Sequence, residues 1–268
     1  MEGPRPLRAE ELPSLVRLLN RTFRAKFPGN FLDQYPQILN PADLERLIVI
    51  SEGGEIVSHV GMAARQISFE GVPLAAALVG AVATAEECRG NGCATRCLDF
   101  ALDRAAREGD DFAWISGGRG LYTSRGAAVA GREWIYQVAA GRKMPEGMMI
   151  GELSIADNSA AVALYEREPV HFLRDRDDWS RAARSRFVLN SKSRFWGVFR
   201  ADRLCAYLIL HEPRADRPAA LVAVLLEASG LRQCACASAR VRPRLITRRD
   251  VAQPNAGSFA PLKLRTIW

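Results

Sequence analysis

The stretch that decides the fold is ALVGAVATAEECRGNGCATRCLDFALDRAARE, residues 77–108. It begins as an apolar run, narrows to Arg89-Gly90-Asn91-Gly92, and continues with apolar residues at helical spacing as far as Gly109. This pattern predicts a buried strand, a tight glycine turn and an amphipathic helix. A helix N-terminus leaves backbone N–H groups without internal partners, and glycines let a ligand approach the chain closely. The turn therefore either only connects the strand to the helix or forms an anion site suited to phosphate.

Two well-known phosphate-binding motifs do not account for this turn. A Walker A loop needs G-x-x-x-x-G-K-[ST], and the sequence contains no such string. A dinucleotide fingerprint needs a third glycine after the first two, but Thr95 stands where that glycine would follow Gly90 and Gly92. Neither a P-loop nor a Rossmann interpretation is favoured.

The composition is that of an ordinary globular protein. The chain has 268 residues, of which 48% are hydrophobic and 25% charged, and this length allows one or two domains. No apolar run approaches the roughly 18–20 residues that a membrane span needs. The N-terminus also lacks the apolar region of a secretory signal. We therefore expect a cytoplasmic protein without a membrane partner.

The cysteines favour free thiols over a metal site. The sequence has six of them: Cys88, Cys93, Cys97, Cys205, Cys234 and Cys236. No pair of C-x-x-C motifs occurs, and the spacing of the first three fits no common zinc pattern. We expect reduced, partly buried thiols and no metal.

The net charge of +7 resides at the C-terminal end. Residues 231–268 contain seven Arg, one Lys and one Asp, so the remainder of the chain is neutral overall. Periodicity also disappears after Gly230. Such a segment is typical of a disordered, solvated basic tail, and contact with nucleic acid or an anionic membrane is the less favoured alternative.

Hydrophobic periodicity divides the first part of the chain into clear elements. It predicts an amphipathic helix over 11–23, a loop or broken helix over 27–41, strands over 44–51, 55–69 and 72–84, a helix over 93–108 and a short strand over 111–116. Gly53-Gly54 and Glu70-Gly71 are expected to form the turns between the three strands. The strand over 72–84 is apolar enough for burial on both faces.

The pattern then restarts after a plausible linker at 142–147. A strand over 148–156, a helix over 156–168, two strands within 194–212 and a further strand within 219–229 repeat the coarse order of the first part. No counterpart of the Arg89–Gly92 turn occurs there. We therefore expect domains over 1–143 and 148–230, followed by the tail over 231–268.

Two motifs give the sequence a family resemblance. VATAEECRGNGCA, residues 82–94, resembles motif A of the GNAT superfamily of acyl-CoA N-acyltransferases, in which a hydrophobic strand runs through R-G-x-G-x-A into a helix. LYTSRGA, residues 121–127, resembles the Y-x-x-x-G element of the same family. The resemblance covers about residues 5–140, and residues 150–230 look like a degenerate second unit of a tandem-GNAT protein. It implies an α/β fold with a mixed central sheet flanked by helices.

The resemblance also implies a reaction and its residues. The chain is expected to transfer an acetyl or similar acyl group from acetyl-CoA to a primary amine of a small molecule or peptide, without a metal. The pyrophosphate is expected to bind Arg89, Gly90, Asn91, Gly92, Cys93, Ala94 and Thr95, and the pantetheine arm Val82, Ala83 and Thr84. One N–H of that strand is expected to polarise the thioester carbonyl. Tyr122 is expected to protonate the departing thiolate, the alternative being a tyrosine packed between helix and strand.

Other roles stay open. Glu52, His59, Glu86 and Glu87 are candidates for the general base, although each is equally an ordinary residue. Glu86 and Glu87 stand where the family usually has proline and arginine or glutamine. His171 and Trp179, in HFLRDRDDW, either line an acceptor pocket or belong to a surface loop or helix end, and the latter is favoured. The rival to catalysis is a module that binds CoA, or contacts nucleic acid, without reacting.

Overall fold

The computed structural model describes residues 1–25, 29–40, 43–115, 117, 119–128, 134–136, 146–153, 158–188, 191–212, 220–226 and 243–245. The chain forms two compact units. The first comprises residues 1–129 and 172–185, and the second comprises residues 130–171 and 186–268. The predicted boundary at 143–148 remains a prediction, since residues 137–145 lie outside the described part of the chain.

The first unit is built on a mixed sheet. Its strands are β1 (Glu2–Pro6), β2 (Leu47–Glu52), β3 (Glu55–Phe69), β4 (Val72–Thr84), β5 (Phe112–Ile115) and β8 (Val170–Leu173). Their order is β1-β2-β3-β4-β5, with β8 pairing with β3. The pairs β1–β2, β2–β3 and β3–β4 are antiparallel, whereas β5 runs parallel to β4. The predicted mixed central sheet is therefore confirmed.

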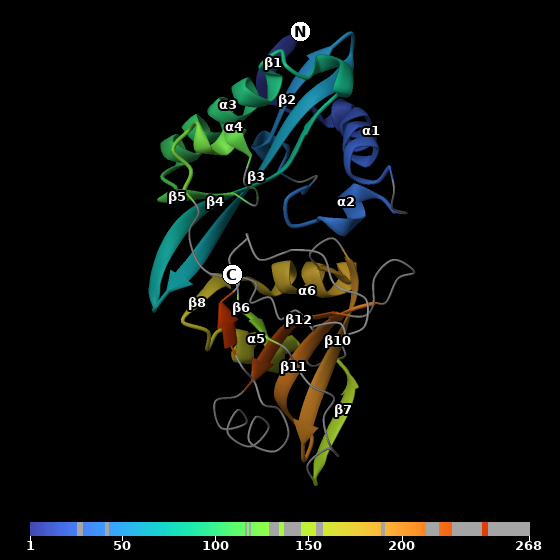
Figure 1. Ribbon diagram of the computed structural model, residues 1–268, viewed down its shortest axis with the longest axis vertical. Coiled ribbons are helices and arrows are strands. Elements are labelled where there is room, and N and C mark those ends of the chain that lie inside the picture. The colour runs from blue at the N-terminus through green and yellow to red at the C-terminus, as the bar shows by residue number, and fades with distance from the viewer. Residues whose placement is uncertain are drawn as a thin grey trace. The chain divides into compact units, whose positions relative to one another are not determined.

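Helices cover this sheet on both sides (Figure 1). They are α1 (Leu12–Phe23), α2 (Phe31–Gln34), α3 (Cys93–Glu108) and α4 (Gly120–Thr123), with short 3-10 turns η1 (Ala9–Glu11), η2 (Leu44–Arg46) and η3 (Glu86–Cys88). The unit also contains α6 (Arg176–Ser185). Helices α1 and α2 lie on one face, and α3 and α4 on the other. The helices predicted over 11–23 and 93–108 are confirmed, and Gly109 ends α3 in a left-handed conformation.

The core is formed where both helix layers meet the strands. Leu15 and Leu19 of α1 and Leu98 of α3 are completely buried, as are Ile48 and Val60 of β2 and β3. Burying an aliphatic side chain of this size contributes about 1.5–3 kcal/mol. The amphipathic stripes of α1 and α3 therefore fix the two helices against opposite faces of the sheet, which sets the direction in which α3 starts.

The hairpin of β3 and β4 is the longest feature of the unit. Phe69 pairs with Val72, and the two residues between them, Glu70 and Gly71, have φ of 51° and 87°. Positive φ at both central positions is the geometry of a tight hairpin turn that matches strand twist. The strands predicted over 55–69 and 72–84 are confirmed.

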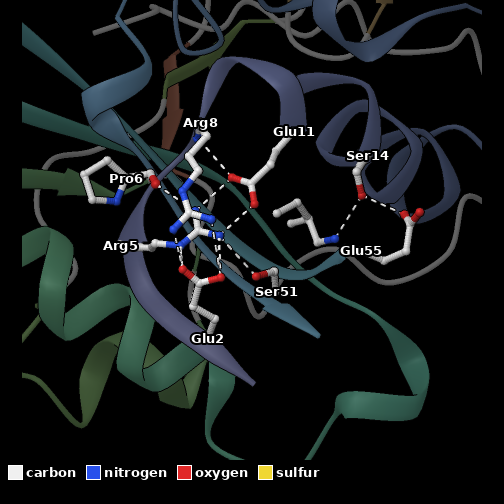
Figure 2. A network of polar contacts seen from close by, with 9 residues as sticks. Glu2, Arg5, Pro6, Arg8, Glu11, Ser14, Ser51 and Glu55 are labelled. Carbon is white, nitrogen blue, oxygen red and sulfur yellow. Dashed lines mark hydrogen bonds and ion pairs between the residues drawn. The ribbon is translucent and has the colours of Figure 1, made fainter. Parts of the chain in front are cut away.

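A network around Arg5 fixes the N-terminal strand to its neighbours (Figure 2). The Arg5 guanidinium contacts Glu2 Oε1 at 2.9 Å and Glu11 Oε1 at 2.7 Å, and it donates to Ser51 Oγ at 3.2 Å. Arg5 and Glu11 are mostly buried, with 16% and 14% of their side chains exposed. Arg5 thereby connects β1 with η1 and with the end of β2.

A second polar contact fixes the start of α1 to the β2–β3 turn. Ser14 Oγ donates to Glu55 Oε2 at 2.7 Å and accepts a hydrogen bond from the Ile56 amide at 2.9 Å (Figure 2). Arg17 also pairs with Glu55 at 2.8 Å, but both side chains are 61% exposed. The buried serine, rather than the exposed ion pair, is therefore the main polar contact here.

In the residues that the structure describes, the second unit is an antiparallel sheet with one helix. Its elements are β7 (Met148–Glu152), α5 (Asn158–Tyr165), β9 (Phe187–Val188), β10 (Ser191–Arg200), β11 (Arg203–His211) and β12 (Ala220–Leu226), together with the separate pair β6 (Trp134–Tyr136) and β13 (Pro243–Leu245). The sheet order is β12-β11-β10-β7, with β9 beside β10. The order of strand, helix and meander follows the sequence expectation, while the tandem layout itself remains a prediction.

Several expectations fall mostly outside the described residues. Of the tail over 231–268, the structure describes only β13, which pairs with β6, so disorder in this tail stays a prediction. Cys234 and Cys236 also lie outside. The cysteines within the described ranges, Cys88, Cys93, Cys97 and Cys205, are buried free thiols. Over those same ranges no group of side chains could hold a metal ion, and no helix is long and apolar enough to cross a membrane.

Candidate active site

The Arg89–Gly92 turn is open to solvent. Gly90 and Gly92 have φ of 84° and 71°, a left-handed conformation that favours glycine. A Cβ built on either glycine would meet no atom within 4 Å. Gly92 is the N-cap of α3, and its position carries no side-chain cap. The end of the helix is therefore neither capped nor covered by the described part of this chain.

Backbone N–H groups are exposed at this helix end. The Arg96 amide donates to the Gly92 carbonyl at 3.0 Å, which is the first bond of the helix. The amides of Cys93, Ala94 and Thr95 precede that bond and have no acceptor among the residues that the structure describes. A 16-residue helix adds partial positive charge at the same point. Free amides and the helix dipole together suit an anion such as a diphosphate.

The charged side chains beside the turn leave room for such an anion. Arg89 is 59% exposed, and its closest carboxylate contact is a long one, 3.9 Å to Glu86. Glu87 pairs with Arg21 of α1 at 3.3 Å. Its own backbone amide, and then Arg21, lower the pKa of Glu87, so this carboxylate is ionised at neutral pH. Arg21 offsets the negative charge that the sequence places beside the turn.

The pairing between strands β4 and β5 ends before the turn. Their parallel ladder runs from Ala76 paired with Phe112 to Val79 paired with Ile115. Beyond Val79, β4 continues to Thr84 without a β5 partner in the described residues. Gly80–Thr84 therefore presents a strand edge whose outward backbone groups are available to a ligand. Val82, Ala83 and Thr84, predicted to bind a pantetheine arm, lie on this edge.

A bulge in β4 determines which amides face the opening. Gly80 pairs with Gly61 and Ala83 pairs with His59, so three steps on β4 match two steps on β3. Ala81, within the bulge, has φ of 52°, an uncommon value for alanine. An extra residue in one strand bends that strand and shifts its alternation.

The alternation of hydrogen bonds on either side of the bulge shows the shift. The Ala75 carbonyl accepts from Asp111 at 2.9 Å, so Ala75, and by alternation Val79, face β5. The Ala85 amide donates to Val57 of β3 at 2.8 Å, so Ala85 and Ala83 face β3. Val82 and Thr84 must then direct their backbone groups towards the side that β5 has left.

Tyr122 lies on α4, the short helix that follows β5. Its side chain is 7% exposed, and its ring packs so closely against Gly117 that a Cβ there would approach within 2.9 Å. Its hydroxyl has no hydrogen-bond partner in the part of the chain that the structure describes. Burial raises the pKa of Tyr122, while the positive charge of Arg119 opposes the shift. The phenol is thus protonated at neutral pH and free to donate, although the same packing also fits a structural tyrosine.

The four base candidates differ in their surroundings. His59 is completely buried, and burial lowers its pKa to about 4. Glu87 is held by Arg21, while Glu52 lies 4.0 Å from the Met1 amino group with 51% of its side chain exposed. Glu86 is 87% exposed. A buried imidazole of this pKa and an ion-paired carboxylate are poorly suited to receive a proton from a bound amine.

The expectation of a surface loop or helix end around His171 and Trp179 is correct in one respect, since Trp179 lies in the first turn of α6, and wrong in placing the two residues on the surface. His171 lies in β8 and Trp179 in α6, with 8% and 9% of their surfaces exposed. His171 Nδ1 contacts the Glu168 carbonyl at 2.6 Å, and its ring meets the edge of Tyr165. These contacts give His171 a packing role. The charges of this segment misled the sequence interpretation because Asp178, beside Trp179, is itself buried and paired with arginines.

The bulge at Ala81 and the side chain that contacts it are not evident from the sequence. His59 Nδ1 lies 2.8 Å from the Ala81 carbonyl oxygen. The sequence offers only one signal for this contact, a histidine in the run 56–64, where Ser58 is the only other polar residue. Nothing in the apolar run around Ala81 marks the residue where the alternation shifts.

Comparison with protein families and solved structures agrees with this geometry. Residues 4–130 match the family model described as Acetyltransferase (GNAT) domain. In the comparison with curated proteins, no significant match was found. The match to the family model spans the glycine turn, the parted strands and Tyr122.

Solved structures share the fold at low sequence identity. The GCN5-related N-acetyltransferase from Anabaena variabilis aligns with a TM-score of 0.65 and 16% identity over 84% of this chain and 58% of that chain. The corresponding protein of Kribbella flavida gives 0.59 and 12% over 85% and 58%. The N-myristoyltransferase of Saccharomyces cerevisiae, solved with bound myristoyl-CoA, gives 0.55 and 10% over 86% and 67%. This chain thus spans 58% of the length of the first two proteins. Residues 4–130 are therefore similar to a GNAT acetyltransferase domain, and the chain shares its fold with GNAT acetyltransferases of known structure.

Proposed function

We propose that this protein is an acyl-CoA-dependent N-acyltransferase, which moves an acetyl or similar acyl group from CoA to a primary amine. The main support for the proposal is that two features lie close together on one stretch of chain. An uncovered helix end with free amides follows, within a few residues, a strand edge that has lost its neighbour. A coenzyme A thioester has a diphosphate that suits the first feature and an amide-bearing arm that suits the second.

The residues fit such a donor in distinct ways. The amides of Gly90–Thr95, with Arg89 beside them, would hold the diphosphate, and the open spaces at Gly90 and Gly92 allow its close approach. The backbone of Val82 and Thr84 would pair with the pantetheine arm. One of those N–H groups would stabilise the negative charge that develops on the thioester oxygen.

The chemical step is a direct attack. The amine nitrogen forms a bond to the thioester carbonyl carbon, and the carbon–sulfur bond breaks with its electron pair going to sulfur. Tyr122 donates its proton to that thiolate, the proton lost by the amine goes to water, and the tyrosinate is reprotonated from water. The raised pKa of Tyr122 keeps the phenol protonated until the sulfur departs. The acceptor, a small molecule or a peptide amine, and a cytoplasmic location remain predictions.

Titration with acetyl-CoA and desulfo-CoA tests the donor assignment. A ligand at a hundred times its dissociation constant stabilises the folded state by about 2.7 kcal/mol, so both compounds should raise the unfolding temperature. Release of free thiol across a panel of amines then tests catalysis. Absence of any shift at millimolar CoA would reject the donor assignment. A shift without thiol release across the panel would favour the rival, a module that binds CoA without reacting.

A further inference from the structure

The starting point is a hydrogen bond across the β3–β4 hairpin. His59 Nδ1 lies 2.8 Å from the Ala81 carbonyl oxygen, and His59 is completely buried. A carbonyl oxygen only accepts hydrogen bonds, so Nδ1 carries the proton and donates it. Burial lowers the pKa of His59 to about 4, which keeps the ring neutral at physiological pH, and the bond to Ala81 selects the tautomer.

The acceptor of this bond is the residue that distinguishes β4 from a regular strand. Ala81 has φ of 52° and lies in the bulge between the pairs Gly61–Gly80 and His59–Ala83. An alanine keeps such a conformation only when its surroundings hold it there. The ladder to β3 continues on both sides of the bulge, and at the bulge itself the imidazole takes the place of a strand partner for the Ala81 carbonyl.

Packing alone does not explain a histidine at this position. The second ring nitrogen, Nε2, is buried and has no partner in the described part of the chain. A leucine would fill a similar volume without burying an unpaired polar atom. The feature that only the histidine supplies is the donor aimed at Ala81.

We infer that His59 is a positioning residue, which holds the Ala81 carbonyl and thereby turns the Val82 amide towards the edge left open by β5. The inference rests on the proposed function, because that edge is where a thioester carbonyl would be polarised. His59 itself touches neither donor nor acceptor in this role. Its effect on the reaction passes through the backbone of β4.

The test compares His59→Leu with His59→Asn. The amide nitrogen of asparagine is as many bonds from Cα as Nδ1, whereas the leucine methyl at that place cannot donate. We expect His59→Leu to lower kcat roughly 10-fold or more, a smaller effect than the roughly 10²–10³-fold loss on removing a donor to the reacting oxygen, because the Val82 amide itself remains. His59→Asn should stay within about threefold of the wild type, and both should bind CoA within about threefold, because the Arg89–Thr95 turn is untouched.

Two further variants separate positioning from general destabilisation. Ala81→Gly placed in the His59→Leu protein should recover part of the lost kcat, because glycine adopts a positive φ without support. Val49→Ala is the matched control: Val49 is completely buried and pairs with His59 from β2, on the side away from β4. It should reduce stability and leave kcat unchanged. Should His59→Leu fail to fold, His59→Gln replaces it, since its donor lies one bond too far out.

The outcomes are decisive for the role of His59. Equal kcat in His59→Leu and wild type, equal losses in His59→Leu and His59→Asn, or a similar kcat loss in Val49→Ala would each overturn it. Amide hydrogen exchange of Val82 in the free protein provides a readout without turnover, and it should change in His59→Leu but not in His59→Asn. If the wild type neither binds CoA nor releases thiol, the proposed function fails, while this exchange comparison still decides whether His59 holds the bulge.

Discussion

Gly92 and Gly109 lie at opposite ends of helix α3 with the same left-handed backbone, at φ of 71° and 85°. A Cβ would meet no atom within 4 Å at either position. A side chain at either glycine therefore costs similar backbone strain, about 1–3 kcal/mol, and encounters no clash. Only Gly92 borders the free amides at the start of the helix, so the two positions separate strain from ligand binding.

We predict that Gly92→Glu abolishes CoA binding and leaves the protein folded, because it brings a side chain and a negative charge to the diphosphate site. Gly109→Glu should bind CoA with normal affinity at a comparable loss of stability. Isothermal titration with CoA measures the first property, and urea unfolding measures the second. Unchanged affinity in Gly92→Glu would remove the turn from the site.

Tyr122→Phe should lower turnover by roughly 100-fold or more, because a positioned proton donor contributes about 10²–10⁴-fold to the rate. The phenyl ring retains the packing against Gly117, so CoA affinity should stay within about twofold of the wild type. Because burial raises the pKa of Tyr122, the wild-type rate should show no loss from phenol ionisation until strongly alkaline pH. Steady-state kinetics with a fixed amine measure both effects, and equal turnover would make Tyr122 a packing residue only.

The stability of the protein should decrease below pH 6.5 because His59 is buried in its neutral form. Its pKa falls from 6.5 to about 4 on folding, so the unfolded chain binds more protons between these values. The free energy of unfolding therefore has its full value with respect to His59 above pH 6.5. It decreases as the pH falls towards 4, by on the order of 3 kcal/mol. Urea unfolding at pH 7.5 and 4.5 should show a steeper loss for the wild type than for His59→Asn. Parallel losses in the two proteins would contradict burial of the ring.

Arg5→Met should lower the free energy of unfolding by about 1–3 kcal/mol at neutral pH, because it leaves the mostly buried Glu11 carboxylate without its main partner. Arg5 lowers the pKa of Glu11, so this contribution is present above the ordinary carboxylate range and disappears as the pH falls through it. The control is Arg17→Met, whose exposed pair with Glu55 should contribute less than about 1 kcal/mol. Equal effects in the two variants would show that burial does not distinguish them.

The sequence predicted the elements whose determinants are local. The strands over 55–69 and 72–84 follow from apolar runs bounded by Glu70-Gly71, and α3 follows from its stripe and its terminal glycines. Strand β1 was not predicted, because two prolines lie within Glu2–Pro6 and its pairing depends on the distant β2. Local pattern carries no information about a partner that lies tens of residues away.

The glycine turn of the candidate site was predictable from the sequence, but the contacts that position the neighbouring strand were not. Glycines at 90 and 92 are visible in the sequence because the turn itself requires them. Neither the bulge at Ala81 nor its contact with His59 could be inferred, since an alanine has no intrinsic preference for a positive φ. The buried Asp178 was missed for a similar reason, because its partner Arg65 lies in another part of the chain.

The shifted register at Ala81 makes the length of β4 more constrained than its composition. Deleting one residue between Gly80 and Ala83 would restore an uninterrupted ladder with β3, in which Ala83 and Thr84 keep their partners His59 and Ser58. The strand would then lose the extra residue that bends it beside the open edge. Side chains along this run can vary widely, whereas the removal of a single residue takes away the bend itself.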